Sequence, residues 1–174
     1  AARAIVREAG ERMHAARLGL PDPLQPYTTP NERVVYGGAG IPPDVFIPID
    51  TTYYSDYYRD MIRTSTITNF VVAYTDRNRK ELLKKYKDGQ QFDRSFSFGN
   101  ETLDELKQAG EKSGVKFDEG QYDTSYPEIV KVMKGLVARD LWDMNEYYMV
   151  VNRDDEAILK ALSIINDSDF YNSL

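Results

Sequence analysis

The chain has 174 residues, with 22 basic and 28 acidic side chains, a formal net charge of −6 and a sequence pI of about 4.9. This acidic balance disfavours a surface that gathers phosphates, so we expect no nucleic-acid partner. The sequence has no cysteine and one histidine, His14, which excludes thiolate sites and a histidine cluster for zinc. We expect no metal site and no cofactor.

The N-terminal third predicts little regular structure. Residues 3–18 have a helix-forming composition, and Gly19 ends that segment. The stretch 20–30 holds four prolines, which fix φ and remove backbone donors, so it predicts an extended connector. Two strand candidates follow at 33–36 and 45–49, and a proline in the second confines it to a sheet edge.

From residue 51 onward the apolar spacing is helical. Apolar residues three and four apart over 67–87 predict an amphipathic helix, which Gly89 would end. A capping box that begins at Thr102 predicts a second helix over 103–113, and Gly114 would close it.

The strongest helical pattern lies nearer the C-terminus. A capping box that begins at Ser125 precedes a stripe of apolar residues at spacings of three and four: Val130, Met133, Val137, Leu141, Met144 and Tyr148. A last helix begins at Asp154 and carries Ile158, Leu159, Leu162 and Ile165. We therefore predict a mainly α fold, with a helical, bundle-like C-terminal domain at 51–174 preceded by a short β-containing segment within 1–50.

Four short sequence motifs, here called sequence words, carry a family resemblance. They read GAGIPPD at 38–44, DTTYYSDYY at 50–58, NRKEL at 78–82 and ARDLWDMNEYY at 138–148. In this order they resemble the C-terminal region of carboxy-terminal processing (tail-specific) serine peptidases, where the end of the catalytic core is followed by the helical tail of one envelope-associated bacterial branch.

The resemblance implies structural roles at the end of the peptidase core for Gly38, Gly40, Ile41, Pro43 and Asp44. The glycines permit a tight turn, and the aspartate is placed to accept backbone N–H bonds. It also implies an upstream peptidase core of the same protein as partner, a protein or peptide substrate, and a location in the periplasm or cell envelope.

The same resemblance places the chemistry outside this chain. Such enzymes use a serine nucleophile and a lysine general base, both upstream of the word at 38–44. The first serine here is Ser55 and the first lysine is Lys80. We therefore assign no catalytic residue and expect the chain alone to be inactive, as the C-terminal portion of a larger peptidase.

A tyrosine cluster is the other candidate site. Tyrosines spaced four apart form one amphipathic face, which predicts docking against the catalytic core or against an external peptide or carbohydrate. The cluster comprises Tyr53, Tyr54, Tyr57 and Tyr58. A second hypothesis is a non-enzymatic helical module for protein binding or substrate docking, which would use this face or the apolar helix over 130–151. A second copy of the chain is a further candidate partner.

Overall fold

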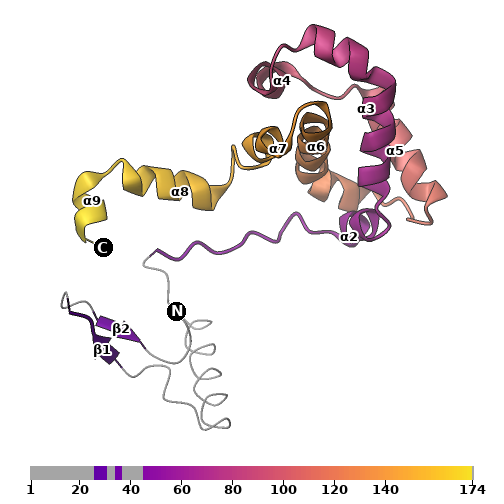
Figure 1. Ribbon diagram of the computed structural model, residues 1–174. Coiled ribbons are helices and arrows are strands. Elements are labelled where there is room, and N and C mark those ends of the chain that lie inside the picture. Colours follow the sequence, from indigo (N-terminus) through magenta and orange to yellow (C-terminus); the bar gives the residue numbers. More distant parts are fainter. Residues whose placement is uncertain (1–25, 31–33, 37–44, 174) are drawn as a thin grey trace. The chain divides into compact units, whose positions relative to one another are not determined.

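The computed structural model describes residues 26–30, 34–36 and 45–173 (Figure 1). The chain divides into two compact units, Ala1–Phe46 and Ile47–Ser173. Several sequence predictions lie outside the described residues: the helix over 3–18, His14, Gly38, Gly40, Ile41, Pro43 and Asp44.

The first unit contains a two-stranded antiparallel sheet of β1 (Pro26–Thr28) and β2 (Val34–Tyr36). Its register places Pro26 opposite Tyr36, Tyr27 opposite Val35 and Thr28 opposite Val34. The strand predicted over 33–36 is therefore confirmed, but its neighbour comes from the proline-rich connector, because a proline is tolerated at the first position of an edge strand.

The strand predicted over 45–49 is wrong. This segment is irregular in the structure, and its large apolar side chains Phe46 and Ile49 are exposed. The apolar run that favoured a strand is therefore not buried against a sheet. Pro48 also removes a backbone donor from any ladder that this segment could join.

The second unit is helical, which confirms the predicted mainly α fold. Its elements in chain order are α2 (Asp56–Arg63), α3 (Thr66–Lys85), α4 (Gly89–Ser95), α5 (Asn100–Lys112), α6 (Glu119–Leu141), α7 (Met144–Val151), α8 (Glu156–Ile165) and α9 (Ser168–Ser173) (Figure 1).

Side-chain caps explain where most of these helices begin. An oxygen of the residue before the helix accepts a hydrogen bond from a backbone N–H two or three residues later. These residues are Ser55, Asp88, Asp118, Asp143 and Asp155. Such a cap contributes about 0.5–2 kcal/mol, because it satisfies a donor that has no partner within the helix.

Two predicted helix boundaries are wrong, the end expected at Gly89 and the start expected at Thr102. Gly89 does not end α3, because the Asp88 side chain caps a new helix that begins at Gly89. Thr102 lies inside α5, which begins after Gly99. Gly114 closes α5 as predicted, and its φ of 80° is a conformation that side chains with a Cβ adopt only under strain.

The long C-terminal helix also differs from its prediction. Asp118 caps α6, so Ser125 lies inside the helix and does not start it. The predicted stripe breaks at Trp142, whose φ of −125° and ψ of −96° are not helical, and a new helix begins after it. Met144 and Tyr148 consequently lie on α7 with exposed side chains.

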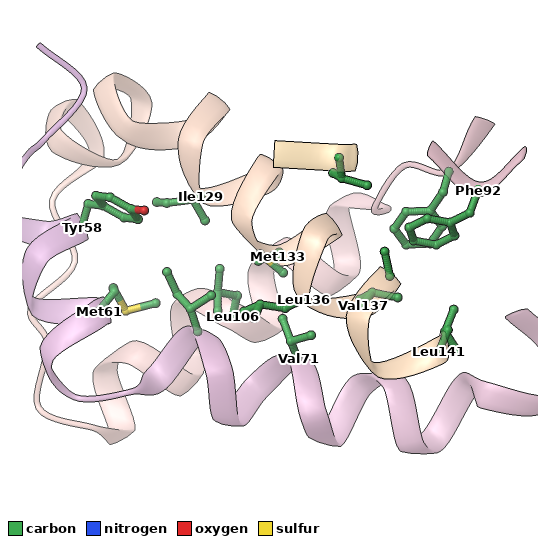
Figure 2. Close-up of a cluster of buried hydrophobic side chains, with 14 of the residues drawn as sticks. Tyr58, Met61, Val71, Phe92, Leu106, Ile129, Met133, Leu136, Val137 and Leu141 are labelled. Atoms are coloured by element: carbon green, nitrogen blue, oxygen red, sulfur yellow. The ribbon is translucent and has the colours of Figure 1, made fainter. Parts of the chain in front are cut away.

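The hydrophobic core lies along α6, against α2, α3, α4 and α7. It runs from Tyr58 and Met61 at one end to Phe92 and Leu141 at the other (Figure 2). Trp142 packs edge-to-face on Phe92, with ring centroids 5.6 Å apart. Burying one such side chain contributes about 1.5–3 kcal/mol, so this core accounts for much of the stability of the helical unit.

Candidate functional site

The predicted tyrosine face is divided between core and surface. Tyr57 and Tyr58 are only 3% and 4% exposed, and they point into the core from α2. Tyr54 is exposed and lies edge-on to Tyr58, with ring centroids 5.2 Å apart, while Tyr53 is half-buried. The four rings therefore do not form one docking face, because the turn of α2 places two of them inside.

Burial also sets the chemistry of these hydroxyls. It raises the pKa of Tyr57 to about 12, with a smaller contribution from the Glu111 carboxylate. It raises the pKa of Tyr122 to about 12 and moves that of Tyr58 upward. Desolvation disfavours the phenolate, so these side chains remain neutral at physiological pH.

A serine pair fixes the segment that leads into α2. Ser125 is fully buried on α6, and its hydroxyl donates to the Tyr53 carbonyl oxygen at 2.5 Å and lies 2.7 Å from the Ser55 hydroxyl. The Tyr57 N–H donates to the Gln121 side-chain oxygen at 2.7 Å. The sequence word at 50–58 is therefore anchored on α6 by hydrogen bonds at Tyr53, Ser55 and Tyr57.

The other two words in the helical unit are joined to each other. The Arg79 guanidinium donates to the Asp140 carbonyl oxygen at 2.7 Å, which links the word at 78–82 to the word at 138–148. Asn78 donates to the Tyr74 carbonyl oxygen within α3. These residues have scaffolding roles, because their polar groups satisfy backbone carbonyls.

A charged cluster joins α4, α6 and the turn after α7. The Asp93 carboxylate is buried and lies 3.2 Å from Lys134 Nζ, and it accepts two hydrogen bonds from Arg153 Nη1 at 3.1 and 3.0 Å. The hydrogen bond to Asp154 and the nearby Asp93 carboxylate raise the pKa of the Arg153 guanidinium. Because Asp93 binds both Lys134 and Arg153, it links α4 to α6 and to the turn after α7.

A groove, here called the α4–α6 groove, opens beside this cluster. It encloses about 350 Å³. Its lining is Asp93, Phe96, Ser97, Phe98, Pro127, Glu128, Val130, Lys131, Lys134, Val150, Arg153 and Asp154. Five of these residues are apolar, and the lysines and Arg153 lie near carboxylates. A second cavity of about 320 Å³ shares Glu128, Lys131 and Asp154 and extends to the first turn of α8.

The α8 helix exposes several large aliphatic side chains. Its residues Ile158, Leu159, Leu162 and Ile165 are 37–63% exposed, and none of its residues is buried. These four residues are here called the α8 face. The spacing of i, i+1, i+4 and i+7 places them on one side of the helix. The sequence pattern predicted this helix and its apolar side, but not its exposure.

Two further findings bound the chemistry of the described part of the chain. No group of three or more histidine, cysteine, aspartate or glutamate side chains there could hold a metal ion. Among the helices of the same residues, none combines the length and the apolar composition that a bilayer span requires.

Comparison with known proteins identifies a family. The model of a family of unknown function (DUF8443) matches residues 57–143, from the first turn of α2 to the residue that caps α7. No curated protein and no solved structure matches the chain. The matched region covers the buried serine and tyrosines, and it ends before α8.

Proposed function

The chain belongs to that family of unknown function, and we propose that its helical unit is an accessory domain that docks a protein through the α8 face. The observation that carries this proposal is the exposure of four aliphatic side chains on one side of a ten-residue helix. Covering them with a partner would contribute about 1.5–3 kcal/mol for each side chain that becomes fully buried.

The pattern of the α8 face suits one mode of recognition. An amphipathic helix that places its apolar side in a groove uses anchors at i, i+3, i+4 and i+7, and α8 offers three of these positions in Ile158, Leu162 and Ile165. An isolated helix of this length is marginal in water. Docking would therefore stabilise α8 as well as bury it.

We further propose that the protein to which this domain belongs is a carboxy-terminal processing serine peptidase. The support is the order of the four sequence words, of which the last three lie in the helical unit and serve to hold it together. The partner of the domain would be the upstream peptidase core, with a protein or peptide as substrate and the periplasm or envelope as location. The alternative is a docking module that serves no peptidase.

Extending the chain upstream in its gene tests the peptidase proposal. We expect the extended protein to cleave unstructured peptides, to lose that activity when an upstream serine or lysine is substituted, and to be active where the 174-residue chain is not. Mass spectrometry of the peptides is the readout. An extended protein without activity, or cleavage by the present chain, would contradict the proposal.

Limited proteolysis of the same extended protein tests docking, whatever the partner. If the α8 face is covered, cleavage within 156–165 should be slow and should accelerate in Leu162→Glu. Leu83→Glu is the matched control, because Leu83 is an exposed leucine on α3, away from α8. Equal cleavage rates in both variants and the parent would remove the case for docking.

A further inference from the structure

We propose that the ion pair between Arg153 and Asp93 is a releasable contact that sets the direction of α8 relative to the helical core. The inference concerns how the α8 face is presented. It rests on the proposed docking function for its use, but the contact and its release are properties of the chain alone. The attachment of α8, the position of Arg153 and the second cation beside Asp93 carry it.

The α8 helix is attached to the core through one short turn. None of its residues is buried, and α9 is the one described element against which it packs extensively. Within the turn, the Asp155 N–H donates to the Asn152 carbonyl oxygen at 3.2 Å, and the Asp155 side chain caps α8. Asp155 and α8 therefore form one rigid piece, whose direction depends on how the turn is held.

Arg153 supplies the contact that holds this turn. Its Nη1 donates to both carboxylate oxygens of Asp93, at 3.1 and 3.0 Å, and so joins the turn to α4. Asp93 is buried, whereas the Arg153 side chain is 51% exposed. Within the described part of the chain, no other hydrogen bond or ion pair joins residues 153–165 to the helices α2 to α7.

Release of this contact leaves neither charge without a partner. Asp93 keeps Lys134, whose Nζ lies 3.2 Å from a carboxylate oxygen and also donates to the Asp93 carbonyl oxygen. Arg153 keeps Asp154, which lies 3.3 Å from Nη2 and belongs to the same turn. Breaking a buried ion pair is costly because it usually leaves an uncompensated charge inside the protein, and that cost is avoided here.

A cavity leaves α8 room to change direction. It encloses about 320 Å³ and is lined both by residues 154–157 and by residues 47–50. In the described residues, no hydrogen bond or ion pair crosses from one of these segments to the other. Hinge motions are absorbed by a few residues at the end of an element, which is the place of Asn152 and Arg153 after α7. With the contact closed, α8 is held in one direction, which reduces the ordering cost of docking.

Pulsed electron paramagnetic resonance measures the direction of α8 as a distribution of distances between two spin labels. The chain has no cysteine, so Thr124→Cys on α6 and Ser163→Cys on α8 would carry the only labels. Both positions are exposed, and neither belongs to the α8 face. Ser163 lies about 12 Å along the helix from the turn, so a rotation of about 30° at the turn moves its label by about 6 Å.

We expect a narrow distribution in the labelled parent chain. Arg153→Gln should make the distribution at least about twice as wide, because α8 then samples several directions. Arg77→Gln is the matched control, since Arg77 forms a comparably exposed ion pair with Glu105, 3.1 Å away, between α3 and α5. This control should reproduce the parent distribution, and circular dichroism should show both variants folded.

A distribution that Arg153→Gln leaves unchanged would overturn the inference, as would a parent distribution as broad as that of the variant. Equal broadening by Arg77→Gln would also overturn it, because the effect would then not depend on the turn. The measurement uses the 174-residue chain without a partner. A failure of docking in the proteolysis of the extended protein would therefore leave this result standing, and the two proposals fail separately.

Discussion

The close approach of α6 and α7 depends on Gly135, and replacing it with alanine should destabilise the helical unit. An added Cβ would lie 2.8 Å from Cγ1 of Val151 and 3.1 and 3.2 Å from ring carbons of Tyr147. A β-branched side chain and a ring have little freedom to move, so α7 itself must shift. Overpacking of this kind costs about 1–3 kcal/mol. Alanine regains about 1 kcal/mol of helix propensity, which leaves a net loss of about 1 kcal/mol.

Gly120→Ala is the matched control on the same helix. The nearest atom to its added Cβ is an oxygen of Asp118 at 3.6 Å, which is an ordinary contact. This variant should gain up to about 1 kcal/mol, so the two variants should differ by about 2 kcal/mol. Urea unfolding followed by circular dichroism measures the difference. Adding Val151→Ala to Gly135→Ala should recover part of the loss. A Gly135→Ala protein as stable as the Gly120→Ala protein would refute the reasoning.

Three further variants test other parts of the structure. Ser125→Ala should lower the free energy of unfolding by about 1–3 kcal/mol, because the Tyr53 carbonyl loses a buried donor; an unchanged denaturation midpoint would contradict this. Asp93→Asn should lower the free energy of unfolding in urea by about 3 kcal/mol, since the largely buried Lys134 loses its carboxylate partner. An unchanged free energy of unfolding would show that this ion pair does not stabilise the fold. Burial raises the pKa of Tyr57 from 10.0 to about 12 in the folded chain. The neutral Tyr57 side chain therefore contributes its full share to the free energy of unfolding below pH 10, and this contribution is lost as the pH rises toward 12. Tyr57→Phe should make that alkaline decline in the thermal midpoint shallower, with the remainder due to Tyr58 and Tyr122, and an identical decline in both proteins would exclude the assignment.

Local sequence signals predicted α3, α5, α6 and α8, but not α2, α4, α7 or α9 as separate helices, and they missed several boundaries. The Asp118 side chain caps α6, so the helix begins before the capping box expected at Ser125. The Asp143 side chain caps α7, so a new helix begins where the apolar stripe predicted one continuous helix past Trp142. Two capping signals close together in sequence compete, and the sequence alone does not show which one the packing favours.

The tertiary contacts of the candidate site could not be predicted from one sequence. Asp93 meets Lys134 and Arg153 across 41 and 60 residues, and no local pattern indicates such pairings. The spacing of the apolar residues predicted the apolar side of α8. Its exposure was not, because an amphipathic stripe has the same period whether it faces a core of its own chain or a partner.

Hydrogen exchange of residues 156–165 tests the docking role of α8 most directly. A ten-residue helix without a partner is marginal in water, so its amides should exchange rapidly in dilute solution. We predict that these amides exchange more slowly in the extended protein than in the present chain, and that Leu162→Glu abolishes this slowing while Leu83→Glu preserves it. Equally rapid exchange of these amides in the present chain, the extended protein and both of its variants would contradict the account.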